Sequence, residues 1–149
     1  MRPLTRHLRA GVAGVEAASG GGFAVAAAAR RCGGWLAGPG DVTVLARGIL
    51  SRGPKVVFIT EGAEGARAIT ASGERRAPAR KVTVADTVGA GDTFNAGVLA
   101  ALHEAGALTK SAIATLPDLV LDAALDLGIR AAAITVSRPG ANPPWRHEL

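Results

Sequence analysis

The chain has 149 residues, a length that fits one domain with a hydrophobic core of its own. Apolar residues make up 48% of it, which argues against disorder, although 20 Gly and many Ala predict a core of small and aliphatic side chains. Three Phe, two Trp and no Tyr leave too few aromatic platforms for stacking single-stranded nucleic acid. The net charge of +5 is concentrated in residues 1–31, which hold five Arg and one Glu, so no basic face for nucleic acid is expected on the remaining chain.

Cys32 is the single cysteine, so no intrachain disulfide can form, and no apolar run reaches the roughly 20 residues of a membrane span. We therefore expect a soluble, cytoplasmic protein without membrane or nucleic-acid partners. Residues 1–40 are rich in Ala and Gly and show no sustained helix or strand period. Ala26–Arg31 could form a helix by propensity, but a poorly ordered or non-homologous segment is favoured, with the folded part at residues 41–149.

The pattern becomes regular after this segment. Asp41 is a good N-cap for a short amphipathic helix that ends before Gly53. Lys55–Thr60 is a continuous apolar run, which predicts a strand buried on both faces. Short strands are expected to follow, separated by turn residues: Ala66–Thr70, Glu74–Ala77 and Lys81–Val84. This order of a helix, a buried strand, a small meander and further helices is typical of a layered α/β fold.

Two long helices are expected in the second half. The first begins at about Gly91 and ends at Gly106, with one apolar face: Phe94, Gly97, Val98, Ala101, Leu102 and Ala105. Pro117 can open the second in its first turn, with these side chains inward: Leu116, Leu119, Val120, Ala123 and Leu127. The end of the second helix stays open, because Ala133–Val136 could also be a strand.

The segment Asp86–Gly97 carries the chemistry. A strand is expected to end near Val84, a glycine-rich loop follows, and a helix then begins. Backbone N–H groups at a helix start lack partners and carry partial positive charge, and Gly89 and Gly91 permit close approach of a ligand. The segment therefore predicts a site for a phosphate or a developing oxyanion.

Asp92 has two interpretations within this segment. It could act as a base that takes a proton from an attacking hydroxyl beside a phosphoryl group. It could equally be a helix cap, and on this segment alone the cap is favoured. A dinucleotide-binding fingerprint is disfavoured, because Gly89-Ala90-Gly91 lacks the third glycine and Asp92 has the wrong charge.

Three segments in order resemble one protein family. Asp86–Phe94 (DTVGAGDTF) looks like the C-terminal signature of the PfkB, or ribokinase-like, carbohydrate kinases. Thr60–Gly65 (TEGAEG) resembles the nucleotide loop T-x-G-x-x-G of that family, and Ser137–Pro143 (SRPGANP) resembles its C-terminal T/S-R-x-G-A segment. Together they cover about residues 40–145. The resemblance implies an α/β fold that corresponds to the C-terminal half of a ribokinase-like three-layer α/β/α fold, with an incomplete sheet.

The resemblance also implies an activity, the transfer of the ATP γ-phosphate to a sugar hydroxyl. Asp92 would be the catalytic base, and the backbone of Gly89, Ala90, Gly91 and Asp92 would form the anion hole. The nucleotide would contact Thr60, Gly62, Gly65, Gly91 and Asp92. Asp86 and the Val88 carbonyl match a monovalent-cation site of ribokinase-like members. The implied cofactors are ATP and Mg²⁺, with K⁺ as a further candidate.

The ending SRPGANPP looks most like bacterial fructokinases, with 2-keto-3-deoxygluconate kinases next. The chain departs from the family at Ile129, where many members place an Asn on the adenine side. The sugar-binding half and the magnesium-linked N-x-x-E motif are not recognised upstream, which favours a truncated copy behind an unrelated or frame-scrambled N-terminus. We then expect doubtful activity of this chain alone and self-association through an exposed sheet edge. A non-catalytic nucleotide-binding or interaction module is the alternative.

Two sets of charged residues are interpreted as surface features rather than as binding sites. Asp118, Asp122 and Asp126 recur every four residues, and a solvated helix face is favoured over a metal site, with Arg130 able to pair with Asp126. A basic cluster on the short strands is expected to be a solvated edge rather than an anion site: Arg75, Arg76, Arg80 and Lys81.

Overall fold

The computed structural model of the protein describes residues 25–29 and 42–149. The strands are β1 (Val25–Ala29), β2 (Val56–Thr60), β3 (Ala66–Thr70) and β4 (Glu74–Ala77). The helices are α2 (Val42–Leu50), α3 (Ala90–Glu104), α4 (Lys110–Ala114) and α5 (Asp118–Val136). Two short 3₁₀ turns complete the set, η2 (Gly62–Glu64) and η3 (Arg146–Glu148). Within these residues, no helix combines the length and the apolar character that crossing a bilayer requires.

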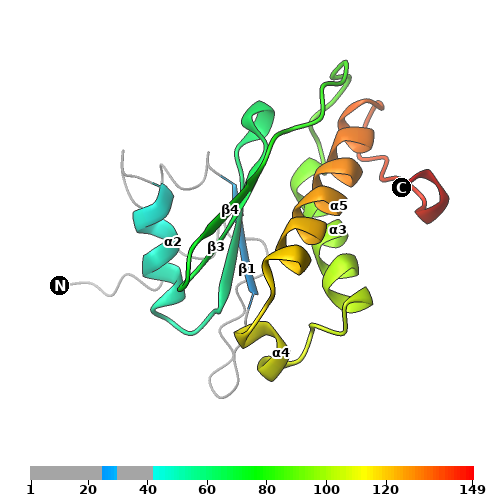
Figure 1. The fold of residues 1–149 in the computed structure, drawn as a ribbon. Coiled ribbons are helices and arrows are strands. Elements are labelled where there is room, and N and C mark those ends of the chain that lie inside the picture. Colours follow the sequence, from blue (N-terminus) through cyan, green and yellow to red (C-terminus); the bar gives the residue numbers. More distant parts are fainter. Residues whose placement is uncertain (1–24, 30–41) are drawn as a thin grey trace, which may run out of the picture.

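The described strands form one sheet in the order β1-β2-β3-β4. β1 runs parallel to β2, with Val25 opposite Val56 and Ala29 opposite Thr60. β2, β3 and β4 form the antiparallel meander that the sequence predicted, and Phe58 lies opposite Ala68 in its centre. The 3₁₀ turn η2 follows β2 directly, at the carboxyl end of that strand (Figure 1).

Helices cover both faces of the sheet, because successive side chains of β2 point to opposite sides. Val57 and Ile59 pack with Ala46 of α2 on one face, and Val56 and Phe58 pack with α3 and α5 on the other. Figure 1 shows α2 on one side of the sheet and α3 with α5 on the opposite side. The prediction of a layered α/β fold with a strand buried on both faces is confirmed.

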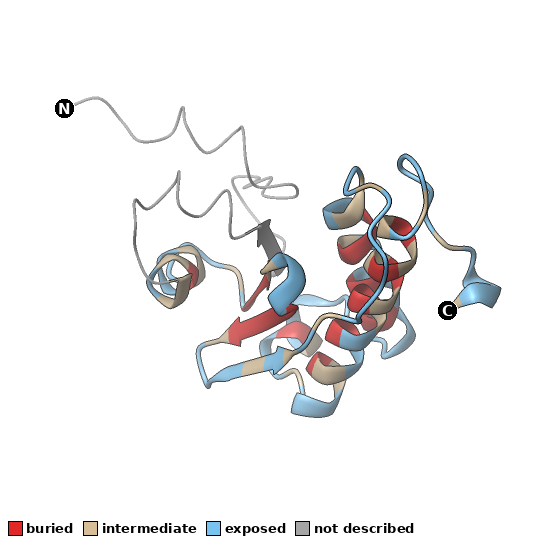
Figure 2. Cartoon of the chain, turned by 90° about the horizontal axis from the view of Figure 1, so that it is seen from above, coloured by how far each residue is buried: buried red, intermediate tan, exposed pale blue. Residues whose placement is uncertain are grey.

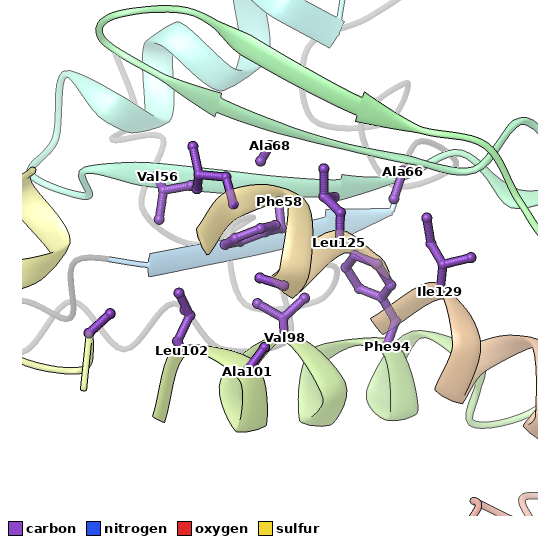
Figure 3. Close-up of a cluster of buried hydrophobic side chains, with 13 residues drawn as sticks. Val56, Phe58, Ala66, Ala68, Phe94, Val98, Ala101, Leu102, Leu125 and Ile129 are labelled. Atoms are coloured by element: carbon purple, nitrogen blue, oxygen red, sulfur yellow. The ribbon is translucent and has the colours of Figure 1, made fainter. Parts of the chain in front are cut away.

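The larger core lies between β2, β3, α3 and α5. Phe94, Val98 and Leu102 of α3 meet Leu125 of α5 under the sheet, and none of them is more than 2% exposed (Figure 3). Figure 2 shows the buried residues gathered on the central strands and on α3 and α5, with exposed residues on the outer surfaces. The predicted apolar face of α3 is confirmed except at Ala105, which is exposed beyond the end of the helix.

Two predictions of secondary structure fail. Ala26–Arg31 was expected as a helix or a loose segment, yet residues 25–29 form β1, because the edge of β2 offers N–H and C=O groups that need partners. The remainder of residues 1–41, including the predicted cap Asp41, lies outside the described residues. Lys81–Val84 is not a strand: no described strand pairs with it, and Val82 and Val84 are 40% and 59% exposed.

The second long helix is present, and its predicted apolar face is confirmed in part, because Leu116, Val120 and Leu127 are half-buried against the core. Leu119 is 79% exposed and Ala123 is exposed as well, whereas Leu121, Ala124 and Leu125 are buried. The most deeply buried face therefore adjoins the predicted one, on the side of α5 that contacts α3. The open alternative at Ala133–Val136 is decided in favour of the helix, since α5 continues to Val136.

Candidate functional site at the start of helix α3

The loop before α3 is held by the end of α5. The backbone N–H groups of Ala85 and Asp86 donate to the carbonyl of Val136 over 2.8 and 3.2 Å. Gly89 is the N-cap residue of α3 in a left-handed conformation, with φ +77°, and a Cβ there would lie 3.1 Å from the Cβ of Ala141. Glycine is therefore required at this position both for its backbone angle and for its lack of a side chain.

Unpaired donors follow at the first turn of α3. The Gly89 carbonyl accepts from both the N–H and the Oγ1 hydroxyl of Thr93 over 2.9 Å each, and the Ala90 N–H donates to Thr87 over 3.3 Å. Among the residues that the structure describes, the N–H groups of Gly91 and Asp92 have no acceptor. Two backbone donors at the positive end of a 15-residue helix are thus available to an anion.

The Asp92 carboxylate lies beside these donors. Its side chain is exposed and makes no hydrogen bond with any described residue, and Gly89, not Asp92, occupies the cap position. The helix-cap interpretation of Asp92 therefore lacks the side-chain hydrogen bond that defines a cap. Asp92 lines one end of a groove of about 630 Å³ that follows α3 to Glu104 and is bordered by Arg130 of α5 and Pro143 of the C-terminal tail.

Asp86 connects the loop to the C-terminal segment. Its Oδ1 accepts from the Val88 N–H and its Oδ2 from the Gly140 N–H, each over 3.0 Å. These backbone donors, Val88 first and then Gly140 and Thr87, hold the pKa of Asp86 below its usual value. A side chain therefore joins two of the three segments that the sequence singled out, across 54 positions of the chain.

The third segment forms a tight turn after β2. Thr60 ends the strand, and the Glu61 N–H donates to the Gly65 carbonyl over 2.7 Å and closes the turn. Gly62 and Gly65 have φ of +63° and +105°, and a Cβ on Gly65 would collide with the carbonyl of Ala77 and lie 2.7 Å from the Ala79 nitrogen. Figure 1 shows this turn and the start of α3 at the same end of the molecule.

Other predicted positions are structural. Ile129 is 7% exposed and packs in the core beside Phe94 (Figure 3). The acidic row of α5 faces the basic cluster instead of solvent alone: Arg75 pairs with Asp122 and Asp118, and Arg80 with Asp126. Arg130 also lies 3.2 Å from Asp126, as predicted. Within the described ranges, no three His, Cys, Asp or Glu side chains are placed to hold a metal ion.

Sequence analysis missed the partners of the turn at Glu61. Arg67, in the middle of β3, is 8% exposed and pairs with Glu61 and Glu74. The available signal was an Arg inside an apolar strand with a Glu on either side in the sequence. A charged residue at such a position is buried only when it is paired.

Comparisons with known proteins place these features in a family. The model of the pfkB family carbohydrate kinases matches residues 15–148. A fructokinase of Rhizobium leguminosarum bv. trifolii is 47% identical over 87 residues, which are 58% of this chain and 27% of that protein. The ribokinase of Bacillus subtilis is 38% identical over 98 residues, 64% of this chain and 29% of that protein.

The fold agrees with a solved member. The crystal structure of aminoimidazole riboside kinase from Salmonella enterica, complexed with aminoimidazole riboside and an ATP analogue, superposes with a TM-score of 0.67 at 29% identity. The match covers 79% of this chain and 37% of that one. The chain therefore spans about a third of the length of these relatives, and its α/β layers correspond to part of the ribokinase-like fold. On the match over residues 15–148, this chain belongs to the pfkB family of carbohydrate kinases.

Proposed function

We propose that the chain carries the phosphoryl-transfer site of an ATP-dependent sugar kinase, fructokinase-like, that passes the γ-phosphate of ATP to a sugar hydroxyl. The observation that carries the proposal is the exposed carboxylate of Asp92, which makes no hydrogen bond with a described residue, beside the two unpaired N–H groups at the start of α3. Such a pairing of a base with anion-binding donors is what hydroxyl activation next to a phosphate requires.

The residues divide the reaction between them. Asp92 takes the proton of the sugar hydroxyl. At the same time the hydroxyl oxygen bonds to the γ-phosphorus, and the bond from that phosphorus to the bridging oxygen of ADP breaks. The N–H groups of Gly91 and Asp92 face the transferred phosphoryl group, whose negative charge the helix dipole also favours. The turn of Thr60, Gly62 and Gly65 would hold the nucleotide, supported by its position at the same end of the molecule (Figure 1). Mg²⁺, when bound with ATP, supplies charge neutralisation of the phosphates.

A monovalent cation such as K⁺ would be held by Asp86 and the Val88 carbonyl. Oxygen donors and a carboxylate that stays ionised suit such a cation, and the lowered pKa of Asp86 keeps the carboxylate charged. Oδ1 of Asp86 accepts from the Val88 N–H and Oδ2 from the Gly140 N–H, and carboxylate oxygens have further lone pairs that a cation can use. The same carboxylate fixes the loop of Val88 and the segment of Gly140, so the cation would brace the anion-binding loop rather than touch the substrate.

The sugar is proposed from the relatives alone. The fructokinase of Rhizobium leguminosarum is the reason for placing fructose first, with 2-keto-3-deoxygluconate as the alternative substrate. The alternative from another class is a module that binds nucleotide without turnover. The two functions differ in one measurement, since a non-catalytic module binds ADP and phosphorylates no sugar.

The test uses the full chain and a chimera. ADP binding is measured by calorimetry on the 149-residue chain. Sugar phosphorylation is then measured on a chimera that joins residues 42–149 to the N-terminal part of the Rhizobium leguminosarum fructokinase. Asp92→Asn in the chimera should lower turnover by about 10²- to 10⁴-fold, the usual contribution of a general base, with ADP affinity retained.

Glu104→Gln is the matched control. Glu104 lies at the far end of the same groove and pairs with Arg146 over 2.7 Å, so this substitution removes the same charge without touching the start of α3. Its turnover should equal that of the unmodified chimera. Asp92→Asn turnover within threefold of this control would remove Asp92 from the reaction and return it to a structural role.

A further inference from the structure

A buried ion pair joins Glu61, the first residue of the turn after β2, to Arg67 of β3. The Arg67 guanidinium donates from Nε to Glu61 Oε2 over 2.9 Å and from Nη2 to Glu61 Oε1 over 2.5 Å, so the pair is bidentate. The Arg67 and Glu61 side chains are 9% and 5% exposed. The third nitrogen, Nη1, donates to Glu74 Oε1 over 3.3 Å. Arg67 therefore connects β3, β4 and the turn.

The pair lies on the α2 face of the sheet. Alternation along β3 places Arg67 on the same side as Ile69, which packs with Ala46 of α2. The groove at Asp92 and the start of α3 lie on the other face. Arg67 is thus excluded from direct contact with that groove, and any effect it has on the site must pass through the turn.

Glu61 stands between the two turn residues Thr60 and Gly62. Its backbone closes the turn through the Gly65 carbonyl, and its side chain is fixed by Arg67. Gly65 in turn lies flush against the end of β4. Two contacts therefore set the orientation of residues 60–65: the ion pair of Glu61 with Arg67, and the close contact of Gly65 with the end of β4.

The cost of burying these charges indicates that the pair serves more than stability. A buried ion pair is often no more stabilising than apolar residues of similar size, because both charges lose their hydration. The bidentate hydrogen bonds, by contrast, fix the relative orientation of the Arg67 and Glu61 side chains, which an apolar contact does not.

Resting on the proposed nucleotide role of this turn, we propose that Arg67 is a positioning residue: its bidentate pair with Glu61 fixes residues 60–65 in the orientation that binds the nucleotide phosphates. Arg67 touches no ligand itself. Without the pair, residues 60–65 would sample more conformations. Nucleotide binding would then have to order the turn, and this loss of conformational entropy would lower nucleotide affinity.

The variant that separates positioning from stability is the double substitution Glu61→Leu with Arg67→Met. It replaces the pair by apolar side chains, so the melting temperature should be unchanged or higher. Two readouts are measured on the full chain, hydrogen exchange of the peptide that covers residues 60–65 and the affinity for ADP by calorimetry. Exchange of the turn should accelerate, and ADP affinity should fall about tenfold, as expected for the ordering of a few side chains.

Arg76→Met is the matched control. Arg76 lies in β4 opposite Arg67 and pairs with Glu74 of its own strand over 2.5 Å. Its side chain is 62% exposed, and among the described residues Glu61 acts on it only as a more distant charge, without an ion pair. This variant should leave both the exchange of the turn and the ADP affinity as in the unmodified chain. The single variant Arg67→Lys, which keeps the charge and loses the fork, should fall between the unmodified chain and the double variant.

The outcomes are distinguishable. Unchanged exchange of residues 60–65 in the double variant would show that Arg67 does not hold the turn and would overturn the proposal. Faster exchange with unchanged ADP affinity would overturn it as well, because the turn would then not serve the nucleotide. If the unmodified chain bound no ADP at all, the proposed function would fail, and the exchange measurement would still decide whether Arg67 orients the turn.

Discussion

Substitution of Gly97 by Ala tests the packing that carries the site. Gly97 lies in the middle of α3, where this helix crosses α5 at Gly128. A Cβ on Gly97 would lie 2.8 Å from the Gly128 Cα and 2.9 Å from the Leu127 carbonyl oxygen. Carbon atoms in contact are normally about 3.5–4.0 Å apart. The atoms it meets belong to the backbone of α5 and cannot rotate away, so the two helices must separate by nearly an ångström.

Two opposing contributions decide how much Gly97→Ala changes the free energy of unfolding. Alanine in a helix interior is favoured over glycine by about 1 kcal/mol. Overpacking of a core costs about 1–3 kcal/mol, and the rigid backbone contact places this site near the upper end. The net loss of unfolding free energy is therefore about 2 kcal/mol, or roughly 6–8 °C in melting temperature for a domain of this size.

Thermal unfolding followed by circular dichroism measures this effect, with Gly48→Ala as the matched control. Gly48 lies in α2, and a Cβ there would meet nothing within 4 Å. The same substitution should therefore raise stability by about 0.5–1 kcal/mol at Gly48 and lower it at Gly97. Gly128→Ala should also destabilise, because its Cβ would lie 2.9 Å from the Phe94 carbonyl oxygen. A Gly97→Ala chain as stable as the Gly48→Ala chain would refute the close crossing of α3 and α5.

Three further predictions concern the site and the sheet. Gly91→Val should leave the fold intact, because a Cβ at Gly91 has open space. It should weaken ADP binding in calorimetry, because a branched side chain would cover the anion-binding N–H groups. Unchanged ADP affinity would show that this helix start is not the phosphate site. Asp86 has a lowered pKa in the folded chain, so its stabilising effect is complete above its unfolded pKa of about 4 and is lost as the pH falls through the lower folded value. Urea unfolding of Asp86→Asn should thus show a deficit at pH 7 that shrinks below about pH 4, and a constant deficit would exclude the charge as its cause. Among the described residues β1 pairs on one side only, so the purified chain should self-associate in light scattering, and a monodisperse monomer would contradict an open sheet edge.

Local patterns were sufficient where one physical signal dominated. The apolar run Lys55–Thr60 predicted a strand buried on both faces, and the apolar spacing of α3 identified its inward face, because burial follows directly from side-chain period. The glycine-rich segment before Asp92 likewise predicted a helix start with unpaired donors, since glycine and helix geometry act locally. These patterns predicted the elements and the helix start at which the candidate site lies.

Local patterns failed where a partner elsewhere in the chain decides the outcome. The alanines of β1 have a helix propensity that pairing with β2 overrides, and Lys81–Val84 has strand composition but no described strand beside it. The inward face of α5 was predicted only in part, with Leu119 and Ala123 wrong, because its apolar residues surround more than one face and contact with α3 selects which of them are buried.

The sequence by itself determined the nature of this protein, in that its three motifs, in order, identified the family and the residues of the candidate site. Only the tertiary structure decided how those residues are held. The bridge from Asp86 to Gly140 and the pair of Asp122 with Arg75 join positions far apart in the chain, where the local sequence does not indicate the partner. For Arg67, glutamates lie nearby in the sequence, but only the fold selects Glu61 as its bidentate partner. The physical reason is that hydrogen bonds and ion pairs of buried or constrained groups depend on distances that the whole fold sets, whereas helix starts, turns and buried strands depend on a few neighbouring residues.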